Sequence, residues 1–217
     1  MTSQNLKPII ELQSNTSHFF NQFYEKHQAH MQCKINCSQC CHVDLSIFEA
    51  EAAAILEWVS NLSEEKKQEL LHLLKQPDQA TKYKKKEACV FLRQNQCSIY
   101  EARPIICRTQ GVALQYKTQM DKNETQINVD VCPLNFASLN NLAEQDSFPK
   151  QNSFPEQKEW LDLDRLNSLQ SIAENFYQKN SIEKPENIPK NKVGRVELKK
   201  LKSYLVEQLE KELLCNL

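Results

Sequence analysis

The segment Cys33-Lys-Ile-Asn-Cys37-Ser-Gln-Cys40-Cys41 decides how this chain is interpreted, because it places four thiols within nine residues. Two or three residues between successive cysteines let their sulfurs converge on one metal ion about 2.3 Å away. The adjacent thiols of Cys40 and Cys41 do not easily point at one small centre, so we expect them to serve two centres, a bridged pair or a larger cluster. A strained vicinal disulfide and one buried neutral thiol are the alternatives for this pair.

The remaining cysteines bring the total to nine in 217 residues. The N-terminus has no basic segment followed by an apolar one, and no stretch approaches the roughly 18 apolar residues of a membrane helix, so we expect a cytoplasmic protein without a membrane partner. Thiols stay reduced there, and clustered cysteines are then more often metal ligands than disulfides. Cys215 stands alone in a predicted C-terminal helix and is interpreted as a core residue. The candidate metal ligands are Cys33, Cys37, Cys40, Cys41, Cys89, Cys97, Cys107 and Cys132.

Short hairpins are predicted to carry the second group of cysteines. Arg103-Pro104 favours an extended residue followed by a helical turn, which holds Cys107 and ends at Gly111. Cys132 directly follows a predicted strand. The predicted hairpins are residues 89–92 with 97–100, joined by Arg93-Gln-Asn-Gln96 without the usual glycine, and residues 112–118 with 124–131.

Helices account for most of the remaining chain. Periodic apolar residues predict helices over about 5–30, 50–59, 64–75, 157–179 and 195–214, and Ser46-Ile-Phe-Glu49 is typical of a capping box. We expect a fold that is mainly α with small β-hairpins (α+β), in which helices wrap a cysteine-rich, metal-bound core. The polar segment 140–156 predicts a linker or long loop. It would separate a cysteine-cluster domain, residues 1–139, from a helical segment, residues 157–217, that packs on the core or on a protein partner.

Composition excludes several classes of function. The net charge is −1, and the lysine run within residues 82–86 lacks interleaved aromatic residues, so we expect a solvated loop there and no nucleic-acid partner. The chain contains only two glycines, which rules out glycine-rich phosphate loops and Rossmann fingerprints.

Cations near the cysteines are candidate cofactor-binding residues. Four thiolates on a zinc ion leave excess negative charge, so neighbouring cations or N–H donors are needed. Arg103 and Arg108 flank Cys107 in the sequence and are placed for that role, and ordinary pairing with Glu101 is the alternative. Lesser ligand candidates are His27, His30 and His42.

These motifs, in this order, resemble the YkgJ-type cysteine-cluster family. The matching elements are Cys33-x3-Cys37-Ser-Gln-Cys40-Cys41, Cys89-Val-Phe-Leu92, Cys97-Ser-Ile-Tyr-Glu-Ala-Arg-Pro104 and Cys107-Arg108. The family is described as zinc- or iron-chelating, is often labelled an iron–sulfur oxidoreductase and is similar to flagellin lysine N-methylase. The resemblance spans about residues 33–132 and implies that the eight cysteines are ligands. The chain departs from the family's common form at Ser38 and Gln39, where a glycine usually precedes the paired cysteines.

Several functions are compatible with such a ligand set. A redox or group-transfer enzyme would hold an iron–sulfur cluster, a structural or binding module would hold zinc, and a storage or delivery protein would expose exchangeable thiolates. Cys33, Cys37 and Cys40 also have the spacing of radical S-adenosylmethionine enzymes, but no glycine-rich cofactor loop or alternating β/α pattern accompanies it. The sequence predicts a metal-binding cysteine-cluster protein with zinc or an iron–sulfur cluster as its cofactor. Oxidoreductase and methyltransferase-like activities are the enzymatic alternatives.

Overall fold

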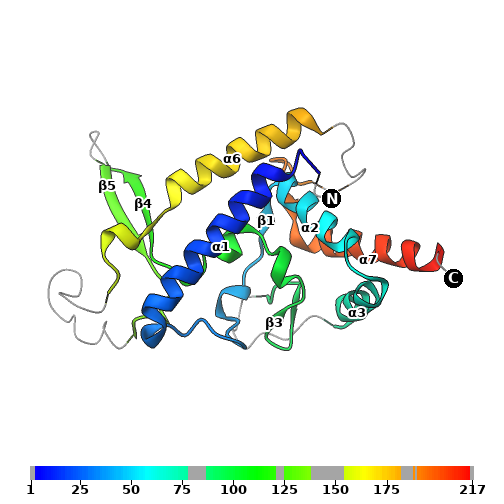
Figure 1. The fold of residues 1–217 in the computed structure, drawn as a ribbon, viewed down its shortest axis with the longest axis horizontal. Coiled ribbons are helices and arrows are strands. Elements are labelled where there is room, and N and C mark those ends of the chain that lie inside the picture. Colours follow the sequence, from blue (N-terminus) through cyan, green and yellow to red (C-terminus); the bar gives the residue numbers. More distant parts are fainter. Residues whose placement is uncertain are drawn as a thin grey trace. The chain divides into compact units, whose positions relative to one another are not determined.

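A computed structural model of the chain describes residues 3–77, 87–120, 125–137, 154–181, 188 and 190–215. These residues form helices and three small sheets, which confirms the predicted fold class (Figure 1). The chain divides into two compact units: unit 1 comprises residues 1–11, 36–104 and 173–217, and unit 2 comprises residues 12–35 and 105–172. The lysine run and most of the predicted linker lie outside the described residues, so the predicted division at 140–156 stays a prediction.

Unit 1 is built on three helices whose apolar faces share one core. These are α2 (Glu49–Ser60), α3 (Glu64–Lys75) and α7 (Leu198–Cys215). The core contains Ile55, Leu74, Phe91, Leu201 and Leu205, all nearly inaccessible to solvent. The short strands β1 (Ser46–Ile47) and β7 (Val196–Glu197) pair antiparallel, and each of them leads into one of these helices, β1 into α2 and β7 into α7.

The start of α2 differs from the prediction. Ser46 pairs within β1, and the helix begins at Glu49. The carboxylate that reaches back to the helix start belongs to Glu51, which accepts the Phe48 N–H at 3.2 Å. The predicted capping box was wrong because strand pairing with β7 occupies Ser46, whereas Ser63 does cap α3 by accepting the Lys66 N–H at 3.4 Å.

The first predicted hairpin exists but is shorter. Strands β2 (Leu92–Arg93) and β3 (Gln96–Cys97) pair antiparallel, with Leu92 opposite Cys97. Its two-residue turn places Gln94 at φ 49° and Asn95 at φ 62°. Positive φ at both central residues is the geometry of a tight hairpin turn, here made without glycine.

Unit 2 joins the larger part of α1 (Lys7–His27) to a three-stranded sheet. Strand β4 (Leu114–Gln119) pairs antiparallel with β5 (Thr125–Asp130) and parallel with β6 (Leu161–Asp162), which confirms the second predicted hairpin; its turn lies outside the described residues. Shorter elements are η1 (Gln28–His30), α4 (Ile105–Arg108) and η4 (Gln157–Glu159). The aromatic stripe of α1 packs on a core of Phe23, Met31, Val112, Ala113 and Phe136.

The helix α6 (Leu163–Asn180) buries only part of its apolar surface. Leu166 and Tyr177 are buried, whereas Leu169, Ile172 and Phe176 are 41%, 63% and 42% exposed. A protein partner for the C-terminal helices therefore stays a prediction.

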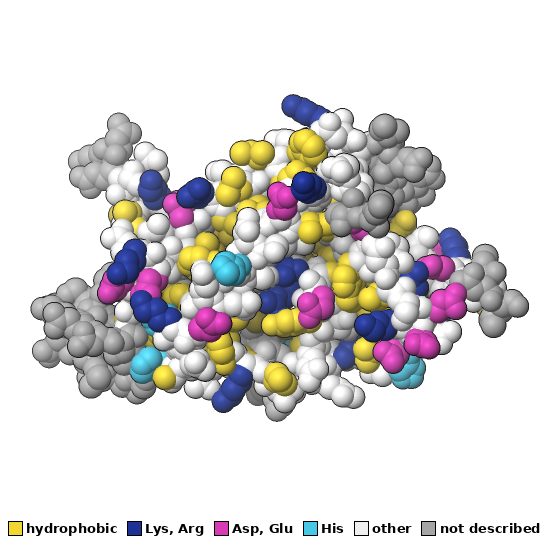
Figure 2. Space-filling model, in the orientation of Figure 1, with side chains coloured by type: hydrophobic (Ala, Val, Ile, Leu, Met, Phe, Trp, Pro, Cys, Tyr) yellow, Lys and Arg dark blue, Asp and Glu magenta, His cyan; other side chains and the backbone are white. Residues whose placement is uncertain are grey.

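Charges of both signs are interspersed over the face shown in Figure 2, as expected for a net charge of −1. Among the described helices, none combines the length and hydrophobicity that crossing a membrane requires.

Candidate metal centre

Backbone contacts bring Cys41 and Cys89 together from distant parts of the sequence. Cys41 ends the single turn η2 (Gln39–Cys41), and its N–H donates to the Ser38 carbonyl at 2.9 Å. The Cys89 N–H then donates to the Cys41 carbonyl at 2.7 Å. The paired cysteines are thus held against the segment that begins the second cysteine group.

The β2–β3 hairpin brings Cys97 back toward Cys89. The Leu92 N–H donates to the Cys89 carbonyl at 2.9 Å, so a tight turn leads into the hairpin, and Leu92 is the partner of Cys97 in the sheet. The Ser38 hydroxyl also donates to the Asn95 carboxamide oxygen at 3.2 Å. Ser38 is one of the positions where the chain departs from the family's common form, and here its side chain fastens the cysteine turn to the hairpin.

Arg93 anchors this hairpin on the C-terminal end of α3. It is 5% exposed and donates to four carbonyls. Its Nε bonds the oxygen of Leu73 at 2.8 Å, and Nη2 bonds those of Leu74 at 3.4 Å and Gln76 at 3.3 Å. Its Nη1 bonds the oxygen of Leu92 at 2.7 Å. The last carbonyls of a helix lack intrahelical partners and carry partial negative charge, so a cation is favourable there.

The thiols of Cys40 and Cys41 share a hydrogen bond and form no disulfide. This bond, assisted by the positive charge of Arg103, lowers the pKa of Cys40 to about 7. The same bond and burial raise the pKa of Cys41 well above its ordinary range, and the nearby thiols of Cys89 and Cys97 act in the same direction. In this arrangement Cys41 is the neutral donor and Cys40 the acceptor.

Cys97 completes the group in unit 1. Burial raises the pKa of its thiol to about 11, although the Ile99 N–H bonds the sulfur and Arg103 lies close enough to lower the pKa. Arg103 also stacks on Tyr100, with its guanidinium carbon 3.8 Å from the ring centroid. Arg103 thus lies near the thiols of Cys40 and Cys97, whereas the sequence placed it beside Cys107, and its cofactor-binding role stays a prediction.

Other predicted residues lie elsewhere. Cys37 is half-buried in the loop of unit 1 before η2, and Arg108 donates to the Ser17 hydroxyl at 2.7 Å in unit 2. Unit 2 also holds Cys33, Cys107 and Cys132. The thiols of Cys40, Cys41, Cys89 and Cys97 thus share one environment within unit 1.

The chemistry of the grouped side chains fits zinc or iron. Sulfur ligands suit both metals, and Arg103 and the Ile99 N–H supply the positive charge and hydrogen bonding that thiolates around a cation need. Within the described residues, no three Cys, His, Asp or Glu side chains are arranged to hold one ion.

Two of the histidine ligand candidates are buried. His42 lies directly after η2, and His27 packs on Phe23 with ring centroids 4.7 Å apart.

Sequence reasoning missed two residues that organise the cysteine segments. The sequence pattern predicts a turn at Arg93, and the buried contact of Arg93 with α3 depends on folding that no local pattern reveals. Asn135, three residues after Cys132, is fully buried and contacts Cys33. A single buried asparagine belongs to no sequence motif with a recognisable spacing, so nothing in the sequence points to Asn135.

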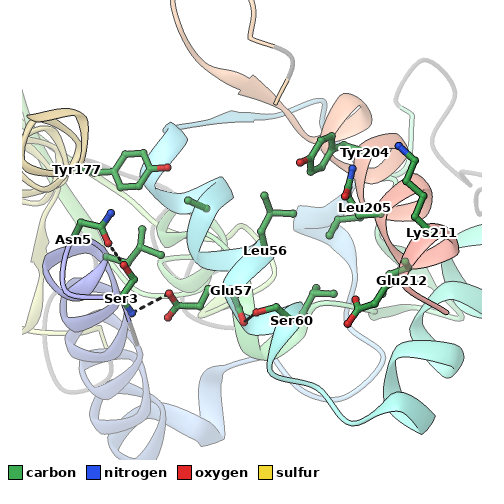
Figure 3. Close-up of a pocket in the computed structure, with 15 residues that line it drawn as sticks. Ser3, Asn5, Leu56, Glu57, Ser60, Tyr177, Tyr204, Leu205, Lys211 and Glu212 are labelled. Atoms are coloured by element: carbon green, nitrogen blue, oxygen red, sulfur yellow. Dashed lines mark hydrogen bonds between the residues drawn. The ribbon is translucent and has the colours of Figure 1, made fainter. Parts of the chain in front are cut away.

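A cavity of about 680 Å³ lies elsewhere in unit 1, and none of its lining residues is a cysteine (Figure 3). Helices α2 and α7 line it with Leu56, Tyr204 and Leu205, and Tyr177 of α6 also faces it.

Comparison with known proteins adds one finding. Residues 32–133 match the family model of the CxxCxxCC domain, described as "Putative zinc- or iron-chelating domain". No curated protein and no solved structure matched the chain. The match contains all eight predicted ligands and both units contribute to it. The resemblance to the cysteine-cluster family is therefore confirmed for residues 32–133, the part of the chain that matches this domain.

Proposed function

We propose that this protein holds a zinc or iron ion in unit 1 through Cys40, Cys41, Cys89 and Cys97. The observation that carries the proposal is the shared environment of these four thiols, in which the Cys89 N–H bonds the Cys41 carbonyl at 2.7 Å. Metal binding requires thiolates, so the proton on Cys41 would leave when the ion binds. The reducing compartment predicted from the sequence would keep the thiols available.

The first role supported by this arrangement is structural. An ion held by these cysteines would join the η2 turn to the β2–β3 hairpin, two segments that otherwise meet through a few hydrogen bonds. Structural zinc contributes on the order of 10 kcal/mol to folding. The bound ion would then fix the geometry of unit 1 around the core of α2, α3 and α7.

Equilibrium zinc titration of the reduced, metal-free full chain tests this proposal. Cys89→Ser and Cys97→Ser should each weaken zinc binding by at least about tenfold, since each removes a ligand. The matched control is Cys215→Ser, which changes a cysteine outside the matched domain and should leave the affinity unchanged. Equal affinity of all three variants and the unchanged protein would refute the assignment.

An iron–sulfur oxidoreductase is the second candidate. It is supported by the Ile99 N–H on the Cys97 sulfur and by the cation of Arg103, because hydrogen bonds and charge near sulfur tune the reduction potential of such clusters. Protein purified without oxygen should then contain iron and acid-labile sulfide in similar amounts. Zinc without sulfide, also after anaerobic reconstitution with iron, would refute this candidate. The methyltransferase-like alternative depends on the family resemblance alone.

A further inference from the structure

The cavity of unit 1 is lined mainly by apolar side chains from one face of each of two helices (Figure 3). On α2 the lining residues include Ala53, Leu56 and Ser60, whose spacing of three and four residues places them on one helix face. On α7 they include Leu205 and Leu209, four residues apart. A volume of about 680 Å³ and mainly apolar walls are typical of sites for small organic molecules.

Residues before α1 close one side of this cavity. The Ser3 N–H donates to the Glu57 carboxylate at 3.0 Å, and the Asn5 carboxamide donates to the Ser181 hydroxyl at 2.7 Å. Ser181 directly follows α6, and its hydroxyl lies near that of Tyr177. The N-terminal residues therefore place Glu57 and Tyr177 at the same side of the cavity.

Tyr177 brings a buried hydroxyl to the cavity from the part of α6 that belongs to unit 1. The residue is 1% exposed, and its hydroxyl points into the region between the labelled residues of Figure 3. Among the described residues, no group meets this oxygen with regular hydrogen-bond geometry, although Ser181 is close enough to influence its pKa. A buried hydroxyl without such a bond costs free energy, and a hydrogen-bonding ligand would remove that cost.

Carboxylates make this side of the cavity negative. Glu57 is half-buried, and the described residues offer its carboxylate the Ser3 N–H but no cation. Burial and the charges of Glu49 and Glu174 raise the pKa of Tyr177 to about 12. The same charges repel an anionic group placed at this hydroxyl, whereas an ammonium group can donate to its oxygen and is attracted by the carboxylates.

Two further charged residues at the cavity already have partners. Lys211 pairs with Glu207, and Glu212 pairs with Lys67, both at 2.6 Å. Their charges are therefore balanced within the protein. Glu57 is the lining carboxylate to which the described part of the chain supplies no cation.

We propose that this cavity binds a small apolar molecule that carries a protonated amine. The Tyr177 hydroxyl accepts an N–H of the amine, and the Glu57 carboxylate supplies the balancing negative charge. The apolar part of the ligand lies against the leucines of α2 and α7. None of the lining residues is a cysteine, so this ligand is separate from the metal of the proposed function.

Titration of the isotope-labelled full chain with phenethylamine, followed by amide chemical shifts, tests the inference. Phenethyl alcohol and hydrocinnamate are the neutral and anionic probes with the same phenylethyl group. The amine should bind at least about tenfold more tightly than either, because only the amine forms a charge-assisted hydrogen bond. The shifts that it causes should centre on α2, α7 and the end of α6.

Two conservative substitutions test the assigned residues. Glu57→Gln removes the charge and keeps an oxygen for the Ser3 N–H, and should weaken amine binding at least about tenfold. Tyr177→Phe should weaken it about 2- to 10-fold, the effect of one hydrogen bond, without lowering the free energy of unfolding. Glu69→Gln, at an exposed position of α3 outside the cavity, is the matched control and should not change the affinity.

Hydrocinnamate bound as tightly as phenethylamine would overturn the assignment of a cationic ligand. Equal affinity for the amine in Glu57→Gln, Tyr177→Phe and the unchanged protein would overturn the site. A lack of amine binding at millimolar concentrations would overturn it as well. These results do not depend on the cysteines, so the proposed metal-binding function stands or fails separately in the zinc titration.

Discussion

Gly111 shows at the scale of one residue why the neighbourhood of a cysteine constrains the chain. Its φ is 101°, and a Cβ atom built there would lie 2.5 Å from the Cys33 Sγ, which gives two separate reasons for glycine. Gly194 offers the comparison, because it has φ 77° but no atom within 4 Å of the position that a Cβ would take. Both glycines thus have a positive φ, but only at Gly111 would a side chain also meet a neighbouring atom.

Gly111→Ala should therefore destabilise the protein more than Gly194→Ala. Both variants incur about 1–2 kcal/mol for a left-handed backbone, and only the first adds a steric conflict, typically about 1–3 kcal/mol. Chemical denaturation of the metal-free variants measures the difference. Removing the sulfur with Cys33→Ala should recover part of the loss in Gly111→Ala. Equal destabilisation by the two alanine substitutions would contradict the contact with Cys33.

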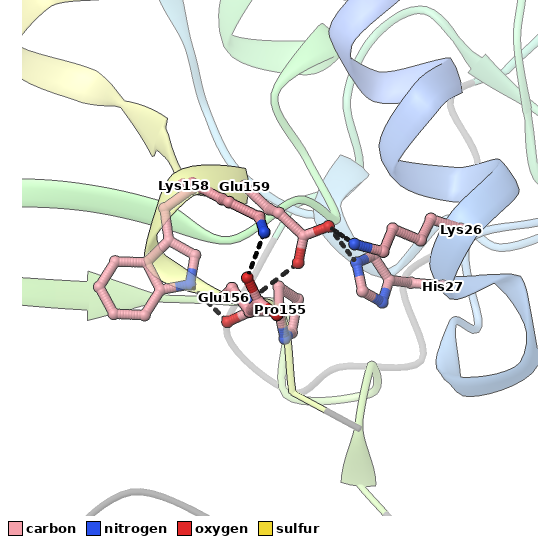
Figure 4. Close-up of polar contacts among 7 residues, drawn as sticks. Lys26, His27, Pro155, Glu156, Lys158 and Glu159 are labelled. Atoms are coloured by element: carbon pink, nitrogen blue, oxygen red, sulfur yellow. Dashed lines mark hydrogen bonds and ion pairs between the residues drawn. The ribbon is translucent and has the colours of Figure 1, made fainter. Parts of the chain in front are cut away.

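His27 is a second residue whose surroundings determine its behaviour (Figure 4). It packs between Phe23 and Phe136, with ring centroids 4.7 and 5.8 Å away, and its Nε2 lies 3.5 Å from the Glu159 carboxylate. Lys26 pairs with the same carboxylate. Burial lowers the pKa of His27 below its ordinary value of 6.5, although Glu159 acts in the opposite direction.

This pKa shift predicts a loss of stability in acid. The folded state binds the His27 proton less readily than the unfolded chain, so the contribution of neutral His27 is fully present above about pH 6.5 and is lost as the pH falls through the folded pKa. Denaturation of the metal-free protein between pH 7.5 and 5 should show this decrease. His27→Gln, which stays neutral, should flatten the curve in that window; a curve with unchanged slope would contradict the assignment.

The contact between the β2–β3 hairpin and α3 is the decisive element for the cysteines of unit 1. Arg93 of β2 bonds two of the last carbonyls of α3 and that of its C-cap residue Gln76. The hairpin carries Cys97, and Cys89 directly precedes it. Its position relative to α3 therefore sets where these two thiols lie.

Arg93→Met should reduce the free energy of unfolding by about 2–3 kcal/mol, because buried carbonyls lose their donor. Arg93→Lys should recover little, since an ammonium group cannot reproduce the planar fork of donors. Zinc affinity should fall as well if the hairpin shifts. Arg165→Met, an exposed position on α6, serves as the control and should change stability by less than about 0.5 kcal/mol. A stability equal to that of this control would refute the anchoring role.

At the scale of the whole molecule, the sequence predicted the fold class, because helical periodicity is a local signal, and the ligands inferred from cysteine spacing stay a prediction. It also placed α3 and the β4–β5 hairpin closely. It did not predict that Cys33 belongs to a different unit from Cys37, although they are four residues apart. That division depends on contacts between distant segments, such as the bond from Cys89 to Cys41 and those of Asn135.

Cysteines of both units should contribute to metal loading of the whole protein. Cys89→Ser and Cys107→Ser should each lower the amount of bound metal and the melting temperature, because structural metal sites contribute to folding free energy. Cys215→Ser should change neither. Elemental analysis and thermal unfolding of proteins purified in parallel provide the check, and metal content and melting temperatures equal to those of the unchanged protein would refute the ligand assignment.

X-ray absorption of the metal-loaded full chain shows whether cysteine sulfurs bind the metal. For zinc, we expect a first shell dominated by sulfur at about 2.3 Å. A first shell of nitrogen or oxygen at about 2.0–2.1 Å, without sulfur, would contradict it.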